Sequence, residues 1–297
     1  MKKLFATLFM VVALYGNAEA QLLYRISGNG LKQTSYIIGT YHIAPASFVD
    51  DIKGAHEVFN SVEQVYGEVD MKEAVEDMTT IEAMMLPEGK TLMEMFSAEE
   101  MERINALMIK IMGVDFNNPI IVSQLGRFRP SVLAMQLMML QYMQQTPDVN
   151  LNELIDDYFQ KEARKAGKRV GGLESAEFQL NILYAPLSDE EERKELLEYV
   201  DENDKVLAQI NELVDIYFSF DIKGIQRITE ASVESGDMTT DEYNKMIRDR
   251  NSRWVENMPK IMNEGSTLFV VGAAHLPGED GILTLLKRDG YKVKAVK

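Results

Sequence analysis

Four short apolar segments that each end in glycine constrain the fold of this chain more than any other feature. They are residues 36–39, 65–67, 170–172 and 268–272, and each contains β-branched or aromatic residues that favour strands. Helical periodicity fills most of the sequence between them. A chain that returns to strand character at both ends and near residue 170 is expected to form one central mixed β-sheet flanked by helices. This is an α/β fold, with α+β as the alternative.

Other signals divide the chain into elements. The predicted strands are 22–28, 34–39, 63–70, 168–174, 267–272 and 291–296. Three pairs with capping-box spacing predict helix starts, and they are Ser97 with Glu100, Ser188 with Glu191, and Thr239 with Glu242. A further helix is expected from Asn150 to Ala166. Since no Pro-, Gly- or Ser-rich linker interrupts the sequence, residues 21–297 are expected to form a single domain with a large helical insertion at roughly 72–166.

Two of the three histidines follow these glycines in the same pattern. Gly39 precedes His42 by three residues, and Gly272 precedes His275 by three residues. A glycine at the end of a buried strand lets the chain turn sharply, and the rim beyond it is where open α/β sheets bind ligands. His56 lies in a helical stretch without this pattern, so we expect it to be a surface or structural residue.

Carboxylates follow the other two glycine-ended segments. Glu68 and Asp70 come after residues 65–67, and Glu174 comes after residues 170–172. If the four strands are parallel, these groups converge with the two imidazoles, a ligand set that suits a divalent transition metal. In the alternative interpretation, each His caps a loop and each Glu pairs with a surface Lys.

Arg250 stands out among the basic residues. It shares a helix face with Met246, Ile247 and Trp254 by three- and four-residue spacing. An arginine buried on an apolar face needs a carboxylate or an anionic ligand to compensate its charge. The alternative is that its side chain extends past these neighbours to water.

The composition excludes several classes of function. The 297 residues include no cysteine, which excludes disulfides, thiolate metal ligands and cysteine nucleophiles. Any metal site must therefore use His and carboxylate ligands. The net charge of −16, from 31 Lys and Arg against 47 Asp and Glu, argues against binding of nucleic acid or of anionic lipid.

The first twenty residues have the pattern of a signal peptide. Lys2 and Lys3 precede an apolar run at 4–14, and Ala18 and Ala20 are the small residues that a signal peptidase reads. We expect cleavage after Ala20 and a periplasmic or secreted protein without stable membrane insertion. A short membrane anchor is the alternative, although the run is shorter than the ~20 residues that span a bilayer.

Several blocks of the sequence together resemble one known family. They are residues 36–42, 67–70, 167–175, 250–251 and 272–278, with Gln179, Gly281 and 290–291. In this order they resemble the TraB/GumN family, whose bacterial members are exported proteins. Tyr41 departs from the family's pattern, which more often has an aliphatic residue there. The family is grouped with the animal Tiki metal-dependent proteases, the erythromycin esterases and the haem-binding ChaN proteins.

The resemblance implies a functional role for the same residues. His42, His275 and Glu68 would bind a divalent metal (Mn, Co or Zn), and Glu68, Arg250 and Glu174 would act in catalysis. The expected function is a metal-dependent hydrolase of the peptidase type, with Arg250 holding a substrate carboxylate or a developing oxyanion. The alternative is an exported protein that binds or sequesters a peptide, metal or haem without turnover. Hydrolysis of small esters is a third possibility.

Overall fold

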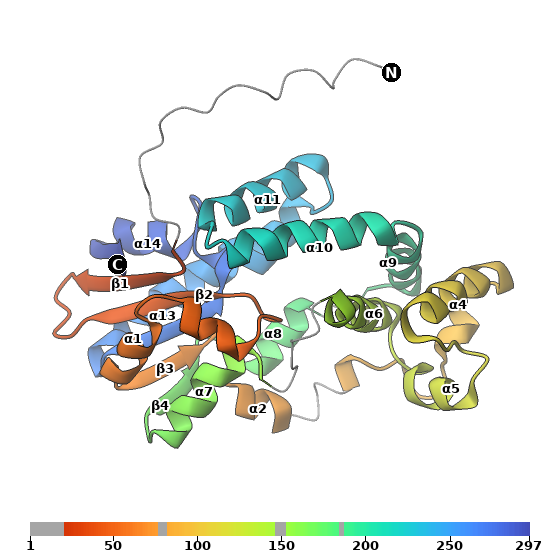
Figure 1. Ribbon diagram of the computed structural model, residues 1–297, viewed down its shortest axis with the longest axis horizontal. Helices are drawn as coiled ribbons and strands as arrows, with labels where there is room; N and C mark the ends of the chain where they lie inside the picture. The colour runs from red at the N-terminus through yellow and green to blue at the C-terminus, as the bar shows by residue number, and fades with distance from the viewer. Residues whose placement is uncertain (1–20, 77–81, 146–152, 184–186) are drawn as a thin grey trace, which may run out of the picture.

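The computed structural model describes residues 21–76, 82–145, 153–183 and 187–297 (Figure 1). The predicted signal peptide at 1–20 and Asn150, the expected start of one helix, lie outside these residues. Within the described ranges, no helix has both the length and the apolar composition needed to cross a membrane.

Six strands form one mixed sheet, which confirms the predicted α/β class. They are β1 (Leu23–Gly28), β2 (Ser35–Thr40), β3 (Gln64–Gly67), β4 (Arg169–Gly172), β5 (Thr267–Gly272) and β6 (Tyr291–Ala295). Their order across the sheet is β4-β3-β5-β2-β1-β6. Strand β1 runs antiparallel to both neighbours, whereas β2, β5, β3 and β4 are parallel to one another.

The parallel strands bring four glycine-ended segments to one edge of the sheet. In the register of the ladder, Thr40 lies opposite Gly272, and Gly67 lies opposite both Val270 and Gly172. The carboxyl ends of the four strands therefore lie side by side. Strand β3 ends at Gly67, earlier than predicted, so Glu68 and Asp70 belong to the loop beyond the strand.

Helices cover both faces of the sheet. On one face, 3-10 helix η1 (Ala46–Asp51), α1 (Ala55–Ser61) and α7 (Ile155–Lys165) pack with Leu268 and Val270 of β5. On the other face, α13 (Asp249–Glu264) and α14 (Ile282–Arg288) pack with Phe269 and Val271. Alternate residues of β5 thus point into two separate cores, as the pleat of a buried strand requires.

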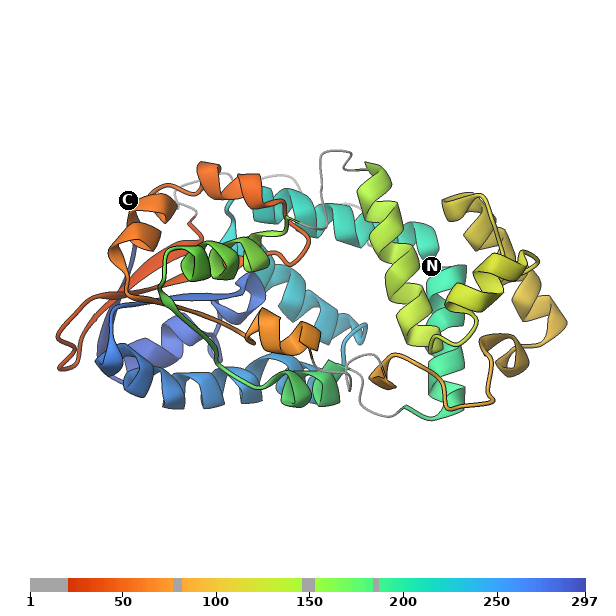
Figure 2. The same ribbon diagram turned by 90° about the horizontal axis from the view of Figure 1, so that it is seen from below.

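A third core lies in a helical lobe at one end of the molecule (Figures 1 and 2). This lobe contains η2 (Leu92–Met95), α4 (Ala98–Met112), α5 (Pro119–Leu125), α6 (Pro130–Gln145) and α9 (Asp189–Asp201). Helix α7, which the predicted insertion includes, packs on β3 and β4 instead, and α9 from beyond the insertion joins the lobe. Helix α10 (Asn203–Phe218) runs from this lobe back to the sheet, where α11 (Ile222–Ser235) packs against it (Figure 1).

The predicted helix starts agree with the structure. Ser97, Ser188 and Thr239 each form a reciprocal capping box with the predicted glutamate. The helical stretch after Thr239 comprises α12 (Thr240–Tyr243), a π-helical turn η3 (Asn244–Arg248) and α13. Short helices α2 (Met71–Glu76), α8 (Ala176–Leu183) and η4 (Ala273–His275) follow β3, β4 and β5 respectively. A loop follows β2, and these connections carry the polar residues described next.

Candidate functional site

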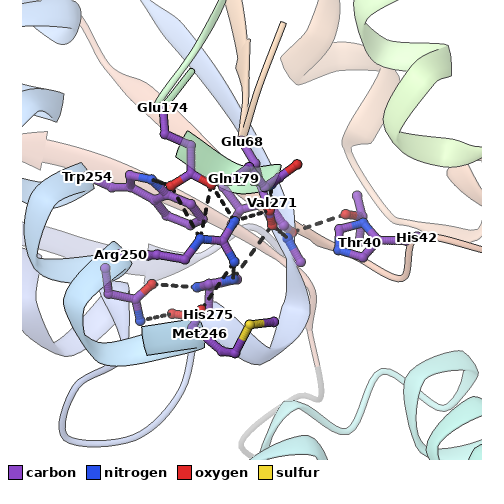
Figure 3. A network of polar contacts seen from close by, with 12 residues as sticks. Thr40, His42, Glu68, Glu174, Gln179, Met246, Arg250, Trp254, Val271 and His275 are labelled. Carbon is purple, nitrogen blue, oxygen red and sulfur yellow. Dashed lines mark hydrogen bonds and ion pairs between the residues drawn. The ribbon is translucent and has the colours of Figure 1, made fainter. Parts of the chain in front are cut away.

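The structure brings His42, Glu68, Glu174, Arg250 and His275 into one group at the carboxyl edge of the sheet (Figure 3). Asp70, which also follows a strand-ending glycine, lies elsewhere, and His56 is a surface residue as expected. Asp70 forms an ion pair with Arg164 on α7. His56 lies on the surface, with its Nε2 atom 2.7 Å from a carboxylate oxygen of Asp50.

His275 is buried and held in one orientation. Its Nδ1 atom lies 2.7 Å from Oδ1 of Asn251, and the Asn251 amide donates hydrogen bonds to two carbonyl oxygens, those of His275 and Asp280. Since the amide nitrogen is the donor, Oδ1 must accept, and the ring hydrogen of His275 sits on Nδ1. Burial lowers the pKa of His275 to about 3, against the opposing charge of Glu68. The neutral ring therefore presents the lone pair of Nε2 toward Glu68, at 3.8 Å from Oε1.

His42 has a matching arrangement on the loop after β2. Its Nδ1 atom lies 3.0 Å from Oδ2 of Asp156, and Oδ1 of Asp156 accepts a hydrogen bond of 2.5 Å from the Thr40 hydroxyl. Desolvation of the ring lowers the pKa of His42, whose side chain is 64% exposed, but the charge and hydrogen bond of Asp156 and the charge of Glu68 outweigh this and raise the pKa to about 9. A metal ion would therefore compete with a proton at Nε2.

Asp156 is a site residue that the sequence did not reveal. It lies in the first turn of α7, where acidic residues are common because they favour the positive end of the helix dipole. Its neighbour Asp157 occupies the same turn and pairs with Lys161. With no motif to separate the two, only the position of the α7 N-terminus beside the loop after β2 identifies Asp156 as the partner of His42.

Glu68 lies between the two histidines and is buried. Its Oε1 atom accepts a hydrogen bond of 2.8 Å from the backbone N–H of Gly272, and its Oε2 atom accepts from Gln179 at 3.0 Å and from Arg250 at 2.6 Å. Burial would raise the pKa of Glu68, but the nearby positive charges and the Gly272 N–H lower it below its usual range. The group is therefore a carboxylate at neutral pH.

Arg250 has no hydrogen-bond donor left for a substrate. Its Nε and Nη2 groups donate to Glu174, Nη2 also donates to Glu68, and Nη1 donates to the Met246 carbonyl and to Nε2 of His275. These contacts use all five guanidinium N–H groups. The guanidinium also lies 4.7 Å from the ring centre of Trp254, whose indole N–H donates to Glu174. Arg250 is thus buried and compensated by carboxylates, as the first interpretation of its helix face predicted.

The histidines and Glu68 suit a metal ion in their chemistry and orientation. A Cβ atom at position 272 would lie 3.2 Å from Oε1 of Glu68 and 3.3 Å from Nε2 of His42, so the glycine leaves space between these two potential ligand atoms. The outward hydrogen bonds from Nδ1 to Asp156 and Asn251 are those that typically orient histidine ligands. Among the described residues, however, no group of three or more His, Asp or Glu side chains is already close enough to enclose an ion.

The site opens into a cavity of about 590 Å³. His42, Glu68, Arg250 and His275 line it on the side of the sheet. Most other lining side chains are apolar, and five of them lie on α10, α11 and η3, namely Leu213, Tyr217, Ile225, Met246 and Ile247. A volume of this size lies within the range of about 300–1,000 Å³ that is usual for small-molecule sites.

Comparison with known proteins relates the chain to one family. The chain is 21% identical over 301 residues to the metalloprotease TIKI2 of Danio rerio, an alignment that covers 88% of this chain and 58% of the relative. The chain therefore spans little more than half the length of that protein. No solved structure matches the chain significantly. The model of the TraB/PrgY/gumN family matches residues 22–295, so the chain belongs to this family.

Proposed function

We propose that the protein is an exported metal-dependent hydrolase that acts on peptides. The observation that carries this proposal is the shared orientation of two histidines. In each ring Nδ1 is held by the protein, by Asp156 for His42 and by Asn251 for His275, and Nε2 is directed toward Glu68 and the cavity. The similarity to TIKI2, a metalloprotease by its name, supports the choice of peptide as substrate. The N-terminal pattern of Lys2, Lys3 and the following apolar run supports export.

His42, His275 and Glu68 would hold a divalent cation such as Mn²⁺, Co²⁺ or Zn²⁺. Bound there, the cation would supply Lewis-acid polarisation of a carbonyl and a lowered pKa for water. Glu68 serves either as a ligand or as the general base, because its carboxylate is ionised and borders the cavity. Asp156 and Asn251 keep the two rings in the required tautomer and orientation.

Arg250 and Glu174 act through Glu68 in this proposal. Arg250 fixes Oε2 of Glu68, and Glu174 fixes Arg250 through Nε and Nη2. Since all guanidinium donors are used, Arg250 orients the carboxylate of Glu68 and does not bind a carboxylate of the substrate. Trp254 completes the support from the other side of Glu174.

The test is metal analysis of the purified protein combined with digestion of a peptide library, with and without chelator. We expect His42→Ala and His275→Ala to lose both bound metal and cleavage. His56→Ala is the matched control, because the third histidine lies on the surface away from the site. If both site variants keep their metal content and cleavage, the proposal is wrong.

A second candidate is an exported protein that binds a peptide, metal or haem without turnover. The contact of 3.2 Å between Arg250 Nη1 and His275 Nε2 favours the binding of a peptide without a metal, because the guanidinium already uses the lone pair that a metal would need. Mass spectrometry distinguishes the two functions, since a binding protein returns its ligand intact and a hydrolase returns fragments. Activity on small esters without activity on peptides would indicate an esterase instead.

A further inference from the structure

We propose that the apolar wall of the cavity, formed by Leu213, Ile225, Met246 and Ile247, binds a bulky uncharged side chain of the substrate. This inference rests on the proposed peptide hydrolysis and assigns its specificity. The wall belongs to three helical elements, α10, α11 and η3, whereas His42, Glu68 and His275 follow the ends of strands. One cavity thus joins the polar groups at the strand ends to an apolar wall on α10, α11 and η3.

The apolar wall is built into the packed structure. Ile225 and Ile247 are only 3% and 7% exposed, and Leu213 packs against the core that contains Ile225. Met246 is held in the π-helical turn η3, where its carbonyl accepts a hydrogen bond from Arg250. Such π-turns are rare and occur frequently at functional sites. The same turn therefore positions part of the apolar wall and the arginine that fixes Glu68.

Two aromatic residues extend the apolar wall toward the strand end that carries His42. Tyr41 and Tyr217 both line the cavity, with ring centres 5.6 Å apart. The Tyr217 hydroxyl donates a hydrogen bond to the carbonyl oxygen of Gly39, three residues before His42. Because the phenol of Tyr217 is directed toward the protein, its ring adds apolar surface next to the strand end that carries His42.

The charges around the cavity disfavour an acidic side chain there. Glu68, Asp156 and Asp157 are carboxylates that line it. The arginine that could pair with another carboxylate, Arg250, already donates all its hydrogen bonds within the protein. Burying a further carboxylate without a partner is costly, whereas an apolar side chain gains by leaving water.

The experiment compares side chains in binding and in cleavage. Calorimetry measures the binding of N-acetyl amides of phenylalanine, leucine, alanine and glutamate to the full chain, and the peptide library gives the preferences around each cleaved bond. We expect phenylalanine and leucine to exceed alanine by about tenfold or more in both, as hydrophobic pockets usually discriminate, with no detectable binding of glutamate.

Two variants at Leu213 test the wall itself. Leu213→Trp fills the cavity and should abolish the preference for phenylalanine, whereas Leu213→Ala enlarges the cavity and should shift the preference toward tryptophan. Leu207→Trp is the matched control, because Leu207 lies on the same helix with similar partial exposure but does not line the cavity. Circular dichroism confirms that each variant is folded.

The outcomes separate this inference from the proposed function. Cleavage without an apolar preference, or an unchanged preference in both Leu213 variants, overturns the assignment of the wall and leaves the hydrolase standing. A different result is also informative: the apolar amides bind selectively, Leu213→Trp abolishes this binding, and no peptide is cleaved. That result supports the assignment of the apolar wall and refutes the proposed hydrolase function. Equal binding of all four amides overturns the inference whether or not peptides are cleaved.

Discussion

Replacement of Arg250 by methionine tests how the site is held together. Arg250 is 4% exposed, and the two carboxylates that it joins are also buried, with side chains that are 8% exposed for Glu68 and 6% for Glu174. The variant Arg250→Met keeps much of the side-chain volume but leaves both carboxylates without their cation. Breaking a buried ion pair by removing one partner costs about 3–5 kcal/mol of unfolding free energy. We expect a loss in that range at neutral pH.

Two companion variants test whether the loss of unfolding free energy comes from the unpaired carboxylates. Arg250→Met combined with Glu174→Gln removes one of the two stranded charges, so it should be more stable than Arg250→Met alone by about 1–3 kcal/mol. Arg250→Lys keeps the charge but replaces a planar fork of five donors with three donors on one atom. We expect it to be intermediate, because one ammonium group cannot reproduce the contacts to Glu174, Glu68 and Met246 together.

The measurement is urea unfolding followed by tryptophan fluorescence. Trp254 is the single tryptophan of the chain, and its ring lies against Arg250 and 4.5 Å from the His275 ring centre. Its emission therefore reports on this site directly. A loss below about 1 kcal/mol for Arg250→Met, with native-like emission, would show that the carboxylates are not held as charged partners of Arg250 and would refute the reasoning.

Three further predictions concern metal binding and the helical lobe. Asp156→Asn should lower metal affinity about 10- to 100-fold, as loss of an outer-shell partner usually does, whereas Asp157→Asn should leave it unchanged in the same titration; equal losses would contradict the role of Asp156. Gly272→Ala should lower the metal content of the purified protein, because the added Cβ would lie 3.2 Å from Oε1 of Glu68; full metal retention would show that the space beside Gly272 is not used. Ser97→Ala should cost about 1 kcal/mol in urea unfolding without changing metal content, since Ser97 caps α4 in the helical lobe.

The convergence of the site could be predicted from local patterns. His42 and His275 each follow a strand-ending glycine, and Glu68 and Glu174 follow two more. Parallel strands end at one edge, so these residues meet once the strands are parallel. The need of Arg250 for carboxylate partners followed in the same way from its position on an apolar helix face.

Other features depend on contacts that no local pattern encodes. Asp156 and Asp157 share one helical turn, and only the position of the α7 N-terminus beside the loop after β2 brings Asp156 to His42, whereas Asp157 pairs with Lys161 on its own helix. Likewise, α7 and α9 are both read as helices from the sequence, but α7 packs on the sheet and α9 in the helical lobe. The predicted insertion at 72–166 therefore includes α7, which packs on the sheet, and omits α9, which packs in the helical lobe.

The sequence by itself determined the α/β class, the capped helix starts and the group of residues at the strand ends. These features depend on residue periodicity, on glycine and on short-range hydrogen bonds, all of which act over a few positions. Only the tertiary structure decided that Arg250 donates all its hydrogen bonds within the protein, to Glu68, Glu174, His275 and Met246. The same holds for the apolar wall of the cavity. The physical reason is that the hydrogen-bond partners of Arg250 and the shape of the cavity depend on side chains that lie far apart in the sequence, between Thr40 and His275.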